Sequence, residues 1–215
     1  MDNLTNSIDQ VVEENALPHE WSKDVLAELK DLEVKNILRD DLRKVPFVTI
    51  DGKDAKDFDD AVFCEANEYG FVLQVAIADV AEIVELDSFI DKEAFLRGTS
   101  IYFPKRVIPM LPEKISNNLC SLVPNEDRNV LVCKINYSKE GEINSYEFSE
   151  AVINSHKRFT YNEVEFIKQN KDINLSAHIL HSINALEKLT KQLLHNRSKR
   201  LSLIHISEPT RPFHI

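Results

Sequence analysis

Five aspartates crowd into the ten residues from Asp51 to Asp60, directly after the apolar run Val45 to Ile50. Two like charges about 4 Å apart repel by roughly 1 kcal/mol in bulk water and by about 4 kcal/mol near a protein surface. A folded loop that holds several carboxylates together therefore needs positive charge among them. Lys53 and Lys56 are one source. A hard divalent cation with oxygen ligands, Mg²⁺ or Mn²⁺, is another, and it brings hydrolytic chemistry.

The same acidic run has two simpler interpretations, a solvated acidic turn and a calcium-binding loop. An EF-hand places acids at alternate positions and follows them with a distal glutamate, and the spacing here does not match that pattern. A calcium-binding structural domain is therefore the weakest of the alternatives.

Composition limits how the protein can bind a partner. The chain has 215 residues, is 43% hydrophobic and carries a formal net charge of −10. This charge argues against binding a nucleic acid by bulk charge alone, so such a partner needs a local basic patch or a metal ion. Cys64, Cys120 and Cys133 lie far apart in apolar surroundings, which indicates reduced core residues of a cytoplasmic protein without disulfides. The first residues have neither the basic nor the apolar region typical of a signal peptide, and no apolar run approaches the ~20 residues that a membrane span needs.

Strand patterns place the acidic run at the end of a sheet. The β-branched run Val45 to Ile50 predicts a buried strand that leads into the acidic loop. Two β-hairpins are predicted where apolar runs flank turns that contain glycine. These runs are residues 61–65 and 71–78 around Gly70, and residues 130–137 and 143–148 around Gly141. We therefore expect a mixed α/β fold with a largely antiparallel sheet and helices packed around it.

Helical periodicity appears on both sides of these strands. A short helix is predicted over residues 8–15, and Ser22 caps a longer one whose apolar positions run from Val25 to Leu38. Further helices are predicted over residues 164–169 and 176–200, the second with an apolar stripe typical of core packing. The proline-rich segment from Arg97 to Glu126 is predicted to be irregular, and long irregular segments usually have a function.

Several sequence blocks, taken together with the acidic loop, carry a family resemblance. They are AIADV at 76–80, RGTSIYFP at 97–104, VIPMLP at 107–112, LCSL at 119–122 and AVINSH at 151–156. In this order they resemble the catalytic (RNB) domain of the ribonuclease II / ribonuclease R family, over about residues 17 to 200. The resemblance implies a processive 3′→5′ exoribonuclease that hydrolyses single-stranded RNA to nucleoside 5′-monophosphates with Mg²⁺, or alternatively Mn²⁺.

The resemblance also assigns roles within the acidic loop. The essential aspartates are implied to be Asp51, Asp57, Asp59 and Asp60, as catalytic and metal-holding residues, and no role is carried onto Asp54. Two metals roughly 3.5 to 4 Å apart can activate water, fix an in-line geometry and neutralise charge on a phosphate. We expect Asp51 and Asp60 to be metal ligands, with Asp57 and Asp59 completing the cluster or positioning the attacking water.

Five further residues are candidates for contact with RNA. Tyr102 stands where the family places an aromatic that stacks on a base, an interaction worth about 1 to 3 kcal/mol and tolerant of sequence. Arg97, Lys105 and Arg106 flank it as candidate phosphate contacts, and Tyr161 is a weaker candidate. The simpler interpretation is packing for the tyrosines and surface solvation for the basic residues.

The remaining expectations concern organisation. Residues 1–44 are expected to be a helical lead-in, and residues 45–200 the front part of the catalytic domain. Residues 201–215 are expected to be a non-native tail, because their sequence resembles a translated sequencing adapter.

In the family, an arginine that stabilises the transition state comes from the rear of the domain, so weak activity is expected. The alternative to an exoribonuclease is a non-catalytic RNA- or metal-binding remnant of that domain. A monomer is expected, and Asp79 and His156 are expected to make structural hydrogen bonds.

Overall fold

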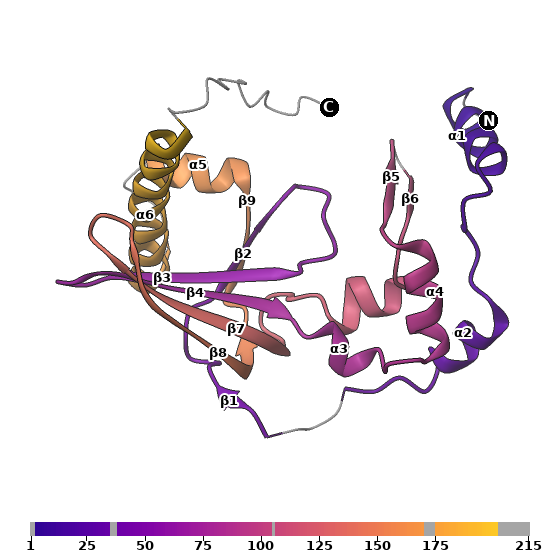
Figure 1. Cartoon of the computed structure of the whole chain (residues 1–215), viewed down its shortest axis with the longest axis horizontal. Helices are drawn as coiled ribbons and strands as arrows, with labels where there is room; N and C mark the ends of the chain where they lie inside the picture. Colours follow the sequence, from indigo (N-terminus) through magenta and orange to yellow (C-terminus); the bar gives the residue numbers. More distant parts are fainter. Residues whose placement is uncertain (1–2, 35–37, 105, 170–174, 202–215) are drawn as a thin grey trace.

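One large sheet dominates the computed structural model, which describes residues 3–34, 38–104, 106–169 and 175–201 (Figure 1). The sheet has seven strands in the order β1-β8-β7-β4-β3-β2-β9. Only the outer pairs β1–β8 and β2–β9 are parallel, so the expected largely antiparallel sheet is confirmed. The strands are β1 Asp40–Asp41, β2 Val48–Asp51, β3 Asp60–Ala66, β4 Gly70–Ala78, β7 Asp127–Ser138, β8 Ile143–Asn154 and β9 Lys157–Thr160.

Helices gather at the two ends of this sheet (Figure 1). One group lies against β2, β3 and β9, and consists of α5 Tyr161–Gln169 and α6 Ala177–Leu201. The other group comprises α1 Asn3–Glu14, α2 Lys23–Glu28, α3 Val80–Ile83, α4 Phe89–Arg97 and the π-helix η1 Ile115–Leu119. A separate hairpin, β5 Ile101–Phe103 and β6 Arg106–Ile108, stands beside this second group. Among the described helices, none combines the length and apolar composition that a membrane crossing requires.

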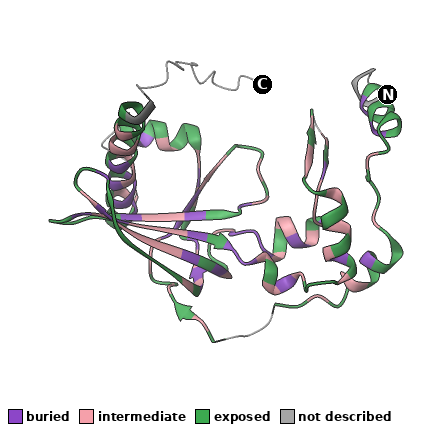
Figure 2. Ribbon diagram, viewed as in Figure 1, coloured by how far each residue is buried: buried purple, intermediate pink, exposed green. Residues whose placement is uncertain are grey.

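Buried residues recur along the strands of the sheet (Figure 2) and belong to separate hydrophobic cores. On one face, Val48 and Phe159 pack against Ile183 of α6. On the other, Phe47 and Val132 belong to the main core, which α2, α3, α4 and η1 cover. Because successive side chains of an extended chain point to opposite faces, Val48 of β2 and Phe47 just before it enter different cores. The acidic loop therefore begins on a strand that is fixed from both sides.

The helix predicted from Ser22 to Leu38 is much shorter in the structure. Ser22 caps it as expected, accepting a hydrogen bond from the Val25 backbone N–H at 3.2 Å, but α2 ends at Glu28. The Lys114 ammonium donates to the Leu29 carbonyl at 2.6 Å, which satisfies an acceptor at the helix end. A tertiary contact thus ends a helix that the periodicity would extend.

Two other predictions need revision. The segment 97–126 is not wholly irregular, since it forms the β5–β6 hairpin and the π-helix η1. Strand β9 was not predicted at all, although it pairs with β2 along its whole length. Leu201 ends α6, and the rest of the suspected adapter tail, 202–215, lies outside the described residues, so its origin stays a prediction.

Gly70 makes the β3–β4 hairpin possible, as predicted. Its φ of +149° is rarely adopted by residues with a side chain, and an added Cβ would overlap the Tyr137 carbonyl oxygen. Gly52, in contrast, has open space around it and an ordinary φ.

We expect Gly70→Ala to lower the free energy of unfolding by about 2–3 kcal/mol, because backbone strain and the clash act together. Thermal unfolding followed by circular dichroism measures this change. Gly52→Ala is the matched control and should change stability by less than about 0.5 kcal/mol. Equal effects of the two substitutions would contradict the argument.

Candidate active site

The acidic loop connects two strands that separate from each other. Asp51 is the last residue of β2 and Asp60 the first of β3, and the ladder between these strands is formed at Val48 and Val62. On its other side, β2 pairs with β9, with Asp51 opposite Thr160. The loop 52–59 therefore leaves the sheet at the point where β2 keeps its partner β9 and loses its partner β3.

Phe58 anchors the loop in the main core. It is 6% exposed, although it lies between Asp57 and Asp59. Its backbone N–H donates to Ser121 Oγ at 3.1 Å, and its carbonyl accepts from the Leu122 N–H at 2.9 Å. The Ser121 hydroxyl donates in turn to the Lys56 carbonyl at 2.9 Å. The LCSL block thus holds the loop on both sides of Phe58.

Arg158 of β9 holds the beginning of the loop. Its guanidinium donates to the carbonyls of Gly52 and Lys53 at 2.8 and 2.7 Å, and it lies 5.0 Å from the centre of the Phe58 ring. Arg158 and Ser121 were not among the predicted site residues. Ser121 lies in a recognised motif block, which was a usable signal. The sequence offered no local signal for Arg158, because its role depends on contacts with residues 106 positions earlier in the chain.

The carboxyl groups of the loop affect one another. Burial raises the pKa of Asp51, and the charge of Asp60 raises it further, while Arg158 opposes both. The pKa of Asp59 is also raised, by burial first and then by the charge of Asp57. Solvent reaches Asp59, which screens these charges in part. Both pKa shifts have burial as their main cause, and repulsion between neighbouring carboxylates adds to it.

The loop offers suitable ligand atoms for a hard cation without forming a closed cage. Asp51 Oδ2 is buried and has no hydrogen-bond partner among the residues that the structure describes. Within the described ranges, however, no three His, Cys, Asp or Glu side chains lie close enough together to hold a metal ion. Mg²⁺ usually takes only one or two carboxylates and completes its shell with water and phosphate oxygens. The residues present fit that kind of site better than a site made only of protein ligands.

The two tyrosines predicted to contact RNA are exposed. Tyr102 lies in β5 with 67% of its surface accessible, and Tyr161 begins α5 with 65% accessible. Tyr161 lines an open hollow of about 360 Å³ together with Asp51 and Gly52. A capping box starts α5, in which the Thr160 hydroxyl and the Glu163 carboxylate bond to each other's backbone N–H groups. The helix cap therefore fixes Tyr161 beside the acidic loop.

Arg97, predicted to contact phosphate, is buried within the fold. Its side chain is only 2% exposed, and its guanidinium lies 3.5 Å from the centre of the Trp21 ring. The guanidinium donates to the Glu93 carboxylate and to the carbonyls of Pro109 and Glu20. Its donors are thus used within the fold.

The other basic candidates have different outcomes. Arg106 is one-third exposed (33%) and forms an ion pair with Asp9 of α1 at 2.6 Å. Lys105 lies outside the described residues. Their roles in RNA contact stay predictions.

Asp79 and His156 make the structural hydrogen bonds that were expected of them. Asp79 accepts from Arg39 at 2.7 Å and also from the backbone N–H of Glu82, which caps α3. His156 Nε2 lies 3.2 Å from the Arg43 carbonyl.

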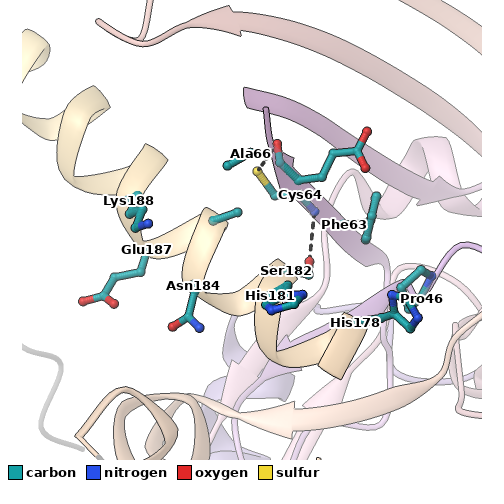
Figure 3. A pocket seen from close by; sticks show the side chains of 12 residues that line it. Pro46, Phe63, Cys64, Ala66, His178, His181, Ser182, Asn184, Glu187 and Lys188 are labelled. Atoms are coloured by element: carbon teal, nitrogen blue, oxygen red, sulfur yellow. Dashed lines mark hydrogen bonds between the residues drawn. The ribbon is translucent and has the colours of Figure 1, made fainter. Parts of the chain in front are cut away.

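A second pocket, of about 550 Å³, lies between β3 and α6 (Figure 3). Ser182 Oγ accepts a hydrogen bond from the Cys64 backbone N–H at 3.0 Å, and His178 and His181 lie on the same helix. Burial raises the pKa of the Cys64 thiol to about 12, so the thiol is protonated at neutral pH and is a poor nucleophile. None of the four aspartates is among the described residues that line this pocket, so it is separate from the acidic loop.

Comparison with known proteins decides the family. The profile of the RNB domain matches residues 39–215, which is most of the chain. The chain belongs to the RNB family. Ribonuclease R from Acidithiobacillus ferrooxidans is 50% identical to this RNB-family chain over 165 residues, which cover 74% of it and 38% of that relative.

Other RNB-family members agree in sequence and fold. Ribonuclease R from Buchnera aphidicola subsp. Schizaphis graminum is 46% identical over 200 residues, which cover 86% of this chain and 27% of that relative. The structure of Mycoplasma genitalium RNase R in complex with double-stranded RNA matches with a TM-score of 0.88 and 36% identity, over 93% of this chain and 36% of that one. This RNB-family chain therefore spans well under half the length of these relatives.

We expect Asp51→Asn to stabilise the metal-free chain at pH 7 by about 0.5–1 kcal/mol, or a few °C in Tm. Folding raises the pKa of Asp51, so the folded state binds this proton more tightly than the unfolded state does. The ionised group therefore costs stability as pH rises from about 4 through the folded pKa. Below pH ~4 the gain should disappear, because Asp51 is then protonated in both states.

Differential scanning calorimetry across pH measures this effect. Asp54→Asn, at an exposed position in the same loop, is the control and should leave Tm nearly unchanged. Excess Mg²⁺ should raise the Tm of the unsubstituted chain more than that of Asp51→Asn. A variant that is less stable at pH 7 would show that Asp51 is not electrostatically strained.

Proposed function

We propose that this RNB-family chain forms the front part of a metal-dependent 3′→5′ exoribonuclease that hydrolyses single-stranded RNA to nucleoside 5′-monophosphates. The observation that carries the proposal is the four-aspartate loop, held around the buried Phe58, in a chain of the RNB family. Relatives named ribonuclease R, and structures of Mycoplasma genitalium RNase R with double-stranded RNA and with ribose methylated single-stranded RNA, support RNA as the substrate.

In this proposal the four aspartates have two roles, metal binding and positioning of the attacking water. Asp51 and Asp60 hold Mg²⁺, or Mn²⁺ in its place, and Asp57 and Asp59 complete its surroundings or orient the attacking water. When bound, the metal activates water and neutralises charge that develops on the phosphate. The unpartnered Asp51 Oδ2 and the raised pKa values of Asp51 and Asp59 support a cation at this position.

RNA is proposed to lie between the two exposed tyrosines. Tyr102 stacks on a base, which suits an enzyme that must accept any sequence, and Tyr161 contacts the strand beside the acidic loop. The net charge of −10 makes this chain a weak RNA binder by general electrostatics, so stacking and the metal are proposed to provide much of the affinity.

The activity of the 215-residue chain is proposed to be low. The resemblance implies that an arginine from the rear of the domain stabilises the transition state, and losing such a group costs several orders of magnitude in rate. One observation favours a second candidate function, a non-catalytic RNA- or metal-binding remnant. In the described part of the chain, no three candidate ligands converge on one point, so the site is incomplete until RNA or other groups contribute.

We expect the chain to release nucleoside monophosphates slowly from single-stranded RNA with a free 3′ end and Mg²⁺. Asp59→Asn should abolish the release, because it removes a carboxylate that the reaction needs. Thin-layer chromatography of uniformly labelled RNA and of its released mononucleotides provides the measurement. Asp54→Asn is the matched control and should retain the rate. RNA and metal binding without any release would favour the remnant, and release that survives Asp59→Asn would disprove the assignment.

We expect Tyr102→Ala to weaken binding to single-stranded RNA by about 1–3 kcal/mol, the usual contribution of one base stacked on an aromatic ring. Fluorescence anisotropy with labelled oligonucleotides of several sequences measures the affinity at fixed salt. Tyr69→Ala is the control, because Tyr69 is 75% exposed in the β3–β4 turn and has no proposed role. If both substitutions weaken binding equally, Tyr102 is not a stacking platform.

A further inference from the structure

We propose that Arg158 is the positioning residue of the acidic loop, fixing where the four aspartates stand relative to one another. This inference rests on the proposed function, because it assigns the geometry of the same site. Arg158 is not proposed to touch substrate. It acts through the backbone and through Phe58.

The first step is the contact with the beginning of the loop. Arg158 Nη2 donates to two successive carbonyls, Gly52 at 2.8 Å and Lys53 at 2.7 Å. Hydrogen bonds from a charged donor are stronger than those between neutral groups. Gly52 directly follows Asp51, so these bonds set the direction in which the chain leaves β2. No residue beyond Asp51 continues the pairing with β9, and Arg158 extends the connection by two residues.

The second step is the contact with the end of the loop. The same guanidinium lies 5.0 Å from the centre of the Phe58 ring, within the range of a cation–π contact. Phe58 is the buried residue between Asp57 and Asp59. One side chain therefore touches both the segment after Asp51 and the residue between the other acids. A change in its position moves Asp51 relative to Asp57 and Asp59.

The third step is the rigidity of the base from which Arg158 acts. Arg158 lies opposite Thr49 in the parallel β2–β9 pair, and its neighbour Phe159 is 2% exposed in the core beneath α6. Thr160 then enters the capping box of α5. The backbone at Arg158 is thus fixed by strand pairing, core packing and a helix cap.

The fourth step is the chemistry that only arginine provides. The planar guanidinium can donate along its edge and lie against a ring with its face, whereas the compact ammonium of lysine cannot do both. Lys53 and Lys56 of the loop itself are exposed. A lysine at this position is therefore expected to keep the positive charge but not the contacts that Arg158 makes.

Hydrogen–deuterium exchange tests the positioning directly. Arg158→Lys and Arg158→Met are compared with the unsubstituted 215-residue chain, and Arg43→Lys serves as the control. Arg43 also forms charged hydrogen bonds, to Asp41 and Asp127, but these lie outside the acidic loop. We expect faster exchange in peptides that cover residues 52–60 for both Arg158 variants, at an unchanged exchange rate in β4 and β7. Unchanged exchange in the loop would overturn the proposal.

Metal affinity tests whether this positioning matters for the site. Electron paramagnetic resonance of Mn²⁺ should show binding that weakens about tenfold or more in Arg158→Lys and Arg158→Met, with Arg43→Lys unchanged, since a 1.4 kcal/mol loss corresponds to tenfold. Lysine keeps the charge, so weaker binding in both variants indicates geometry. Loss of the positive charge alone would favour a bound cation, so unchanged or tighter Mn²⁺ binding in Arg158→Met would overturn the proposal, as would full retention of binding in Arg158→Lys.

The two proposals fail in distinguishable ways. If the unsubstituted chain binds no Mn²⁺ while loop exchange still depends on Arg158, the metal-dependent function is wrong and the positioning stands. If every variant binds Mn²⁺ equally, the positioning is wrong and the function stands. Where turnover is measurable, Arg158→Lys should lower kcat by up to about 100-fold, the cost of a misplacement of about 1 Å, with KM for RNA unchanged. A changed KM with an unchanged kcat would contradict positioning.

Discussion

Burial of Phe58 is the constraint on which the acidic loop depends. A phenyl ring that leaves water contributes about 1.5–3 kcal/mol, which is comparable to the repulsion between two closely spaced carboxylates near a protein surface. The main core therefore holds the loop in place against the mutual repulsion of its own charges. Ser121 and Leu122 reinforce this anchor through backbone hydrogen bonds. The acids and the core cannot be understood separately, because the residue between Asp57 and Asp59 belongs to the core.

Burial and mutual repulsion of the carboxylates in this loop reduce the stability of the fold. Asp51 is raised in pKa by burial and keeps an unpartnered buried oxygen, while Arg158 compensates only in part. Sites that bind cations or perform chemistry are where proteins commonly sacrifice stability for function. The surrounding sheet makes this possible, since β2 is packed on both faces and paired with β9 beyond the point where β3 separates from it.

Local sequence patterns were sufficient for part of this structure. The two central hairpins, their glycine turns, the Ser22 cap and the acidic loop follow from residues that are close together in the chain, and a single sequence displays them. The end of α2 did not follow, because Lys114 satisfies the helix terminus from 85 residues away. The burial of Arg97 did not follow for a related reason, since its contact with the Trp21 ring and its hydrogen bond to the Glu20 carbonyl involve residues about 76 positions earlier. Strand β9 and Arg158 were missed because parallel pairing leaves no local signal.

The parallel pairing of β2 with β9 also affects the kinetics of folding. Contacts between segments so far apart in sequence form slowly, because a large loop must close before they can contribute. On a ribosome, which adds about 5–20 residues each second, the aspartates emerge several seconds before β9 does. During that interval the acidic loop has neither its strand partner nor its arginine. The newly made chain thus cannot complete this support of its carboxylates until β9 has been synthesised.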